Sequence, residues 1–276
     1  MPDIPLLIAL DMDGSLLTTA KQLTARSRDA LERAAAAGAW IVPATGRFFL
    51  GLPEEIRTAP FLRYAITING ASVLDREAVV YRAEIPWRRA VEAMEYLDTQ
   101  DLIYDCYQDS WGWITRDFQE RAAEFVPDQY YLKMLRALRS PVDELKAHLS
   151  DVKRDVQKII IFTRTDALQD ELLKTLPERF PDLAVTSSAR HNIELNDPPA
   201  NKGDALRALA AALDIPMERT MAVGDGLNDM TMLRAAGIRV AMGNAQPELK
   251  AIATYVTDDC DHDGAAKAVE LFCGLS

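Results

Sequence analysis

The chain has 276 residues, of which 49% are hydrophobic, and a formal net charge of -11. This length and composition indicate one large α/β domain or two smaller ones, and they exclude a largely disordered chain. The negative charge argues against a nucleic-acid partner, since proteins that follow a phosphate backbone carry a basic surface.

The sequence shows no apolar run long enough to span a membrane, and the run near the amino terminus is too short and lacks the basic flank of a signal peptide. Cys106, Cys260 and Cys273 lie far apart, without the spacing of a zinc site or a redox dithiol. We therefore expect a cytoplasmic protein with reduced thiols and no membrane contact. No obligate protein partner is evident.

The first predicted element is a buried strand over residues 5–10, which Asp11-Met12-Asp13-Gly14 follows directly. Parallel sheets hold their ligands beyond the carboxyl ends of the strands. One carboxylate there can act as a nucleophile or metal ligand, and a second can move protons. Asp and Gly are also common where a strand stops and a helix begins. On these residues alone, a catalytic pair and a capping pair are equally good interpretations.

Two further strands are predicted to end in polar or glycine-containing turns. A helix that begins at Thr24 and stops at Gly38 leads to a strand over 39–44, which ends at Thr45-Gly46-Arg47. A third strand, over 64–68, ends at Asn69-Gly70. Because right-handed crossovers join parallel strands, we expect all three ends at one edge of one sheet.

The middle of the chain is predicted to be an inserted domain. A hairpin over 72–85 is followed by predicted helices and strands. None of these predicted strands ends in paired carboxylates. The helices are expected over 86–100, 142–149 and 166–176, and the strands within 102–115 and over 155–163. We expect a core domain in residues 1–83 and 191–276, interrupted by an α+β insertion in residues 84–190.

The returning core domain repeats the pattern of the first strands. A strand over 220–223 ends at a Gly-Asp-Gly-Leu-Asn-Asp turn that holds Asp225 and Asp229. Together with Asp11 and Asp13, these carboxylates would form an oxygen-rich site of the kind that Mg²⁺ prefers. A shared divalent cation would also let a carboxylate approach a phosphate dianion without repulsion.

Groups that suit a phosphate are predicted near the same edge. Lys202, at the start of a predicted helix, can supply a positive charge. Thr45, Gly46 and Asn69 can offer hydroxyl or backbone N–H donors. The acidic cluster and these groups together indicate phosphate chemistry.

In this order, the motifs resemble those of the haloacid dehalogenase superfamily, specifically the Cof-type phosphatases with a large inserted cap. The resemblance rests on DMDGSLL, ATGR, the lysine of NKGDAL and GDGLND, with NGA after the third strand and MGNA after the fifth. It covers nearly the whole core, whereas the cap is similar only in length and alternation. It implies an α/β fold with a Rossmann-like parallel-sheet core and an inserted α+β cap that closes over the substrate.

The resemblance also implies a role for each site residue. Asp11 would attack phosphorus and carry an aspartyl-phosphate, and Asp13 would protonate the leaving oxygen, which requires an elevated pKa. Thr45 and Lys202 would be catalytic residues that hold the phosphoryl group. The implied phosphate contacts are Gly46, Asn69 and Asn228. The implied Mg²⁺ site consists of Asp11, the backbone carbonyl of Asp13, Asp225 and Asp229, the last by orienting bound water.

Four residues fit the pattern less closely. Ser15 replaces the more usual Thr but keeps the hydroxyl, and Cys260 stands where Asn is usual, so the contact made there is in doubt. Arg47 is as well explained by an ion pair as by a phosphate contact. His191 could touch the leaving group, although an ordinary strand or hinge residue is favoured.

Our hypothesis is an Mg²⁺-dependent phosphomonoesterase that acts on a small phosphorylated metabolite such as a sugar phosphate. A phosphomutase or phosphotransferase would use the same core chemistry. A sensor without turnover is the alternative from another class, and the intact set of acidic residues speaks against it. A dinucleotide-dependent oxidoreductase would need a glycine-rich turn where this chain has Asp-Met-Asp-Gly.

Overall fold

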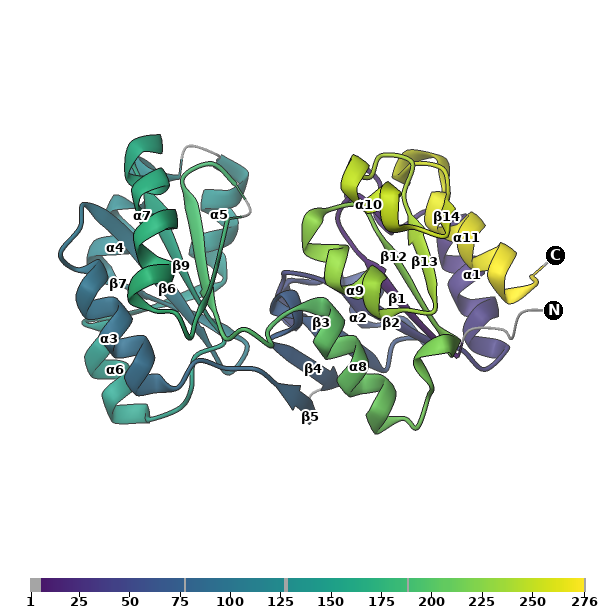
Figure 1. Cartoon of the computed structure of the whole chain (residues 1–276), viewed down its shortest axis with the longest axis horizontal. Coiled ribbons are helices and arrows are strands. Elements are labelled where there is room, and N and C mark those ends of the chain that lie inside the picture. Colours follow the sequence, from purple (N-terminus) through teal and green to yellow (C-terminus); the bar gives the residue numbers. More distant parts are fainter. Residues whose placement is uncertain (1–5, 77, 127–128, 188, 276) are drawn as a thin grey trace. The chain divides into compact units, whose positions relative to one another are not determined.

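The computed structural model describes residues 6–76, 78–126, 129–187 and 189–275. Pro5 and Glu77, which the predicted first strand and hairpin include, lie outside the described residues. The chain divides into two compact units, of which unit 1 comprises Met1–Arg82 and Pro199–Ser276 and unit 2 comprises Ala83–Pro198 (Figure 1). None of the helices in the described ranges is both long and apolar enough to cross a membrane.

Within the described residues, unit 1 contains an eight-stranded sheet in the order β14-β13-β12-β1-β2-β3-β4-β5. The strands from β14 to β3 pair in parallel, and β3, β4 and β5 pair antiparallel. Their bounds are β1 Leu7–Asp11, β2 Trp40–Ala44, β3 Tyr64–Thr67, β4 Ser72–Asp75, β5 Ala78–Arg82, β12 Thr220–Gly224, β13 Ile238–Ala241 and β14 Tyr255–Val256.

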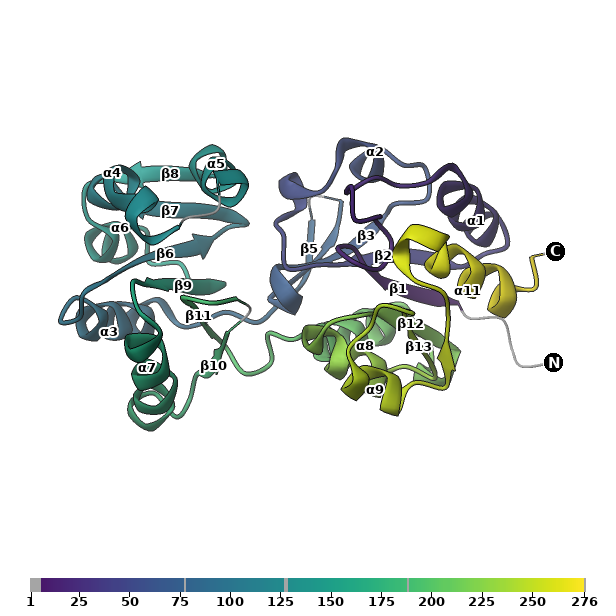
Figure 2. The same cartoon turned by 90° about the horizontal axis from the view of Figure 1, so that it is seen from above.

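Helices cover both faces of this sheet. Helix α1 packs against α11, α8 packs against α9, and Figure 2 shows these two pairs on opposite faces. The sheet is therefore buried on both sides, which explains why every residue of β1 is buried. The bounds are α1 Ala25–Ala36, α2 Glu54–Arg57, α8 Lys202–Ala212, α9 Met230–Ala235, α10 Pro247–Ile252 and α11 Gly264–Cys273, with 3₁₀ turns η1 Phe49–Gly51, η2 Ile68–Gly70, η3 Met217–Arg219, η4 Leu227–Asp229 and η5 Cys260–His262.

Unit 2 has its own sheet and its own apolar core. The described residues form six strands in the order β10-β11-β9-β6-β7-β8. The bounds of the strands are β6 Leu102–Gln108, β7 Trp111–Thr115, β8 Arg139–Val142, β9 Lys158–Thr163, β10 Ala184–Thr186 and β11 Asn192–Asn196. The bounds of the helices are α3 Trp87–Leu97, α4 Arg116–Phe125, α5 Gln129–Ala137, α6 Leu145–Val152 and α7 Asp166–Arg179.

The two faces of the unit 2 sheet differ. Ile159 and Ile161 belong to the apolar core that α3, α6 and α7 complete. Phe162 points the other way, because side chains alternate along a strand, and stacks on Phe118 of α4 with ring centroids 5.7 Å apart. The opposite face also carries charged side chains, which are compared with the site of unit 1 below.

The second unit boundary differs from the prediction. The predicted core was expected to resume at residue 191, but β11 pairs antiparallel with β9 and β10 and so lies in unit 2. The boundary falls at Pro198, and the first one lies at Arg82 rather than at residue 83. Local sequence does not show which sheet β11 joins, because its partner β9 lies about thirty residues earlier in the chain.

Candidate active site

The parallel register of unit 1 brings the predicted carboxylates together. Asp11 ends β1 and pairs with Ala44 of β2, and Leu10 pairs with Val223 of β12. Asp225 directly follows β12, so it lies at the same edge of the sheet as Asp11. One carboxylate oxygen from each of Asp11, Asp225 and Asp229 can be chosen so that all three lie within 4.8 Å of one another.

Lys202 connects two of these carboxylates. It is the first residue of α8, which Asn201 caps by accepting a hydrogen bond from Asp204 N. Its side chain is fully buried, and Nζ donates to Asp11 Oδ1 and to Asp229 Oδ1, both at 2.6 Å. Burial alone would lower the pKa of Lys202, but Asp11 and Asp229 outweigh it and raise the pKa. Asp11 and Asp229 therefore favour the charged ammonium form of Lys202.

Both carboxylate oxygens of Asp229 accept hydrogen bonds from the protein. Its Oδ1 accepts from Lys202, and its Oδ2 accepts from the backbone N–H groups of Asp225 and Gly226, each at 3.0 Å. A Cβ at position 224 would lie 2.6 Å from the Asp229 carboxylate, so glycine at this position leaves room for that carboxylate. Asp229 thus folds the loop that presents Asp225 and holds Lys202 in place.

Asp11 experiences an excess of negative charge. Burial and repulsion by Asp229 raise its pKa from 3.8 to about 8, although Lys202 acts in the opposite direction. Burial also raises the pKa of Asp225. Three carboxylates beside one ammonium leave two negative charges when all are ionised, and all the candidate ligand atoms are oxygens. This set fits a hard divalent cation in both charge and chemistry.

The hydroxyl of Ser15 has a defined partner. Ser15 Oγ donates to Asp225 Oδ1 at 3.0 Å. A threonine hydroxyl at this position could make the same contact, so the difference from the Cof-type pattern leaves the interaction intact.

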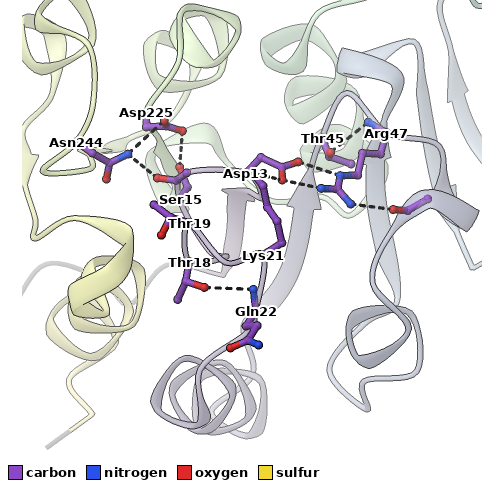
Figure 3. Close-up of polar contacts among 12 residues, drawn as sticks. Asp13, Ser15, Thr18, Thr19, Lys21, Gln22, Thr45, Arg47, Asp225 and Asn244 are labelled. Atoms are coloured by element: carbon purple, nitrogen blue, oxygen red, sulfur yellow. Dashed lines mark hydrogen bonds and ion pairs between the residues drawn. The ribbon is translucent and has the colours of Figure 1, made fainter. Parts of the chain in front are cut away.

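Asp13 does not have the environment that the sequence led us to expect. Burial raises its pKa, but hydrogen bonds from Arg47 and Lys21 prevail and lower it. Arg47 binds both carboxylate oxygens, with Nε 2.9 Å from Oδ2 and Nη2 2.6 Å from Oδ1. Lys21 Nζ lies 2.9 Å from Oδ1 (Figure 3). The expected elevated pKa of Asp13 is therefore wrong for the protein without substrate, because two cations outweigh the effect of burial.

The structure thus gives Arg47 an ion pair within unit 1, the first of its two interpretations. Arg47 also donates from Nη1 to the Gly51 carbonyl at 3.1 Å. The guanidinium is fixed from both sides, which holds the Asp13 carboxylate in one orientation.

The predicted phosphate contacts lie close together. The Thr45 N–H donates to the Ile66 carbonyl, and the Asn69 N–H donates to the Thr45 carbonyl. These two residues can therefore offer only their side chains to a phosphate. Asn69 has a left-handed backbone, with φ 53°. Its Oδ1 accepts from Asn228 Nδ2 at 3.4 Å and lies 3.0 Å from where a Cβ on Gly46 would be. Glycine at position 46 permits this close approach.

The structure gives the Cys260 thiol no nucleophilic role and places His191 in unit 2. Cys260 is buried, and burial raises the pKa of its thiol. Its contact with the site is a backbone one, since Cys260 N donates to Asn244 Oδ1 at 3.1 Å. His191 belongs to unit 2, where its Nε2 lies 3.0 Å from Asp166 Oδ1.

Sequence reasoning missed Lys21 and gave Asn244 no role. Nothing in the local sequence around Lys21 points to Asp13, because the contact depends on a left-handed residue, φ 61°, in the turn that carries it. Asn244 lies in the MGNA motif, shortly after a strand. This position beyond the end of a strand is the sequence feature that could have identified it as a site residue.

Comparisons with known proteins agree with this geometry. The sequence profile of the haloacid dehalogenase-like hydrolases matches residues 8–269. The chain is 33% identical to the phosphatase YwpJ of Bacillus subtilis, over 94% of this chain and 97% of the relative. It is 31% identical to the HMP-PP phosphatase of Cronobacter sakazakii, over 92% of this chain and 95% of the relative.

A solved structure has the same fold. BT1666 from Bacteroides thetaiotaomicron, described among the phosphatases of the haloalkanoate superfamily, matches with a TM-score of 0.80 at 27% identity, covering 98% of this chain and 95% of that one. Fold and site together define a hydrolase of the phosphatase class with a Rossmann-like α/β core. The chain belongs to the haloacid dehalogenase-like hydrolase family, as a Cof-type member. The predicted family and fold class are thereby confirmed.

Proposed function

We propose that the chain is an Mg²⁺-dependent phosphomonoesterase that hydrolyses a small phosphorylated metabolite through an aspartyl-phosphate on Asp11. The observation that carries this proposal is the buried cluster of Asp11, Asp225 and Asp229 around Lys202 at the end of the parallel strands. Mg²⁺ held by Asp11, Asp225 and the Asp13 carbonyl would neutralise the cluster and the substrate phosphate.

The residues of the chain then divide the reaction between them. The Asp11 carboxylate attacks phosphorus, and the bond from phosphorus to the leaving oxygen breaks. Lys202 holds the Asp11 carboxylate through Oδ1 and supplies positive charge beside the reacting group. The Thr45 hydroxyl and the side chains of Asn69 and Asn228 would donate to the phosphoryl oxygens.

Asp13 is the proton carrier in this proposal. It gives a proton to the leaving oxygen and takes one from the water that attacks the aspartyl-phosphate, which releases phosphate and restores Asp11. In the structure its carboxylate is bound by Arg47 and Lys21, which favour the ionised form. We propose that the substrate phosphate competes for Arg47 and so weakens its hold on Asp13.

The substrate class rests on the relatives. One of them, 29% identical, is named as a 5-amino-6-(5-phospho-D-ribitylamino)uracil phosphatase of Bacillus subtilis, and another as an HMP-PP phosphatase. Both names denote small phosphorylated metabolites, and we propose a substrate of this class, such as a sugar phosphate. The free thiols of Cys106, Cys260 and Cys273 suit the reducing cytoplasm, which is the proposed location.

Phosphate release by the full-length protein tests the proposal. A panel of phosphorylated metabolites is assayed with Mg²⁺ and with EDTA, beside Asp11→Asn and the surface control Asp29→Asn. We expect Mg²⁺-dependent release by the wild type and the control, with one alcohol formed per phosphate. Acid-quenched enzyme should carry a hydroxylamine-sensitive phosphoryl group that Asp11→Asn lacks.

Other outcomes decide against parts of the proposal. Transfer of the phosphoryl group to an added polyol without free phosphate would identify a phosphotransferase. Equal hydrolysis of the best substrate by wild type and Asp11→Asn would show that Asp11 is not the nucleophile.

A further inference from the structure

Asn244 links three segments of unit 1 at the cation site. It lies in the turn after β13, where its Nδ2 donates to the Gly14 carbonyl at 2.8 Å and to Asp225 Oδ2 at 3.3 Å. Its Oδ1 accepts from Cys260 N at 3.1 Å. Figure 3 shows the amide pointing toward Asp225 and toward the loop that carries Ser15. The side chain is exposed, so its contacts belong to the site rather than to the apolar core.

Asp225 is held by neutral donors on both sides. Ser15 donates to Oδ1 and Asn244 to Oδ2, so each oxygen accepts one side-chain hydrogen bond that carries no charge. Lys202, in contrast, is a charged donor that partly neutralises the carboxylates of Asp11 and Asp229. A hydroxyl and an amide fix the direction of a carboxylate while leaving its charge for a cation.

The same amide also fixes the backbone beside Asp13. Gly14 has φ 91°, and a Cβ there would lie 2.5 Å from Asp225 Oδ2. The Gly14 backbone therefore packs directly against the Asp225 carboxylate, and Asn244 binds both groups at once. Any rotation of Asn244 would release the carboxylate and this backbone together.

The orientation of Asn244 is in turn set by a backbone group of the carboxyl-terminal turn. Asp259 caps this turn, since its Oδ1 accepts from Asp261 N and from His262 N, each at 3.0 Å. Gly243 N donates to the Asp258 carbonyl at 3.0 Å, which ties the turn to the Asn244 loop. Because Cys260 acts through its N–H, its side chain is not part of this contact.

We propose that Asn244 is a positioning residue for the divalent cation, orienting Asp225 and the Gly14 backbone, with its own orientation set by the Cys260 backbone N–H. This inference rests on the cation site of the proposed function but on no step of the phosphate chemistry. It also explains how Cys260 can replace the usual Asn: the contact with the site needs no particular side chain at this position.

Cation binding by the full-length protein tests the proposal without substrate. Mg²⁺ binding is followed by calorimetry, and Mn²⁺ binding by electron paramagnetic resonance. Asn244→Ala and the similarly sized Asn244→Leu should each weaken binding by about 10-fold or more, the lower end of the range for residues that orient a metal ligand. Ser15→Ala should act in the same direction, whereas Ser15→Thr should bind like the wild type.

Cys260→Asn and Cys260→Ser are the matched controls, and both should bind Mg²⁺ within about twofold of the wild type because they keep the backbone donor. Melting temperatures in EDTA should agree between the wild type and the Asn244 variants, because the Asn244 side chain is exposed, and this separates positioning from folding. In a phosphatase assay, the Asn244 variants should need more Mg²⁺ for half-maximal activity and recover most of their kcat at saturating Mg²⁺.

The outcomes separate this inference from the proposed function. If the wild type binds Mg²⁺ and the Asn244 variants bind it equally well, the positioning role is wrong and the proposed function stands. Weaker binding in the Cys260 variants, as large as in Asn244→Ala, would also overturn it. If the wild type binds no divalent cation, both this inference and the Mg²⁺ dependence of the proposed function fail.

Discussion

Each unit buries charged side chains on or beside its sheet, but the two clusters differ in charge balance. In unit 1, Asp11, Asp225 and Asp229 surround the ammonium of Lys202. In unit 2 the opposite charges are matched in two buried pairs on the sheet. These pairs are Asp105 with Arg139, 2.7 Å apart, and Lys158 with Glu194, also 2.7 Å apart.

In the unit 2 pairs, each carboxylate contacts one cation. Arg139 donates from Nε to Asp105 and from Nη2 to the Tyr107 hydroxyl, and its side chain crosses the position that a Cβ on Gly112 would occupy. Each carboxylate has its own cation, so no external charge is needed. The unit 1 cluster has three carboxylates for one ammonium, and burial together with repulsion by Asp229 raises the pKa of Asp11. An uncompensated cluster suits a site that receives a cation, whereas a compensated one stabilises a fold.

The largest expected effect is on catalysis in unit 1. Asp11→Asn should lower the rate of phosphate release by about 10⁴-fold or more, the scale seen when a catalytic nucleophile is removed. Without metal, the melting temperature should stay the same or rise, because the change removes one of three mutually repelling carboxylates. Steady-state kinetics and thermal unfolding in EDTA measure the two effects. A large loss of metal-free stability would show that Asp11 is a structural residue like those of unit 2.

The next effect is on stability in unit 2. Asp105→Asn leaves the Arg139 guanidinium buried without its counter-charge and should cost about 3–5 kcal/mol in the free energy of unfolding. Trp87, Trp111 and Trp113 lie in unit 2, so tryptophan fluorescence in urea mainly reports its unfolding.

The matched control replaces the whole pair. Asp105→Leu combined with Arg139→Met should be far less destabilising than Asp105→Asn, because neither charge is left alone. A cost of less than about 1 kcal/mol for Asp105→Asn would mean that unit 2 does not depend on its pairs.

A further effect is expected from pH on the metal-free protein. The pKa of Asp11 is raised from 3.8 to about 8, so the folded state binds a proton that the unfolded state releases above pH 4. The stability due to this proton is complete below pH 4 and is lost as pH rises through 8. Melting temperatures in EDTA should therefore fall between pH 5 and 8, and Mg²⁺ should reduce the slope.

Asp11→Asn is the control for this pH dependence, because it removes the titrating group. If the variant shows the same slope as the wild type, the excess charge on the unit 1 cluster has another source.

The unit 1 cluster could be predicted largely from sequence, because its residues lie at the ends of predicted strands and at the start of a predicted helix. Asp11 and Asp225 follow buried strands, and Lys202 begins a helix after an asparagine cap, so parallel pairing brings them to one edge. The buried pairs of unit 2 could not be predicted. Asp105 and Arg139 come from strands that are not adjacent in the sheet, and local periodicity does not reveal which strands lie near one another.

The environment of Asp13 failed to follow from sequence for the same reason. Asp11 is two residues away and suggests repulsion, whereas Arg47 lies 34 positions further along the chain. Lys21 reaches Asp13 only through the left-handed backbone of its turn. A nearby like charge is visible in the sequence, but the cations that lower the pKa of Asp13 become apparent only in the fold.

Asp13 is the carboxylate of unit 1 that most resembles those of unit 2, and it gives the smallest prediction. Arg47 and Lys21 lower its pKa, so Lys21→Met should raise that pKa and move the limb of the kcat/KM profile that Asp13 governs to higher pH. The shift should be below about one pH unit, because Lys21 is half exposed and Arg47 remains bound. Met carries the same backbone strain as Lys at φ 61°, and Lys21→Arg, which keeps the charge, should leave the profile unchanged. If Lys21→Met moves that limb to lower pH, Asp13 is not the acid that the profile reports, and its pairing is structural, as in unit 2.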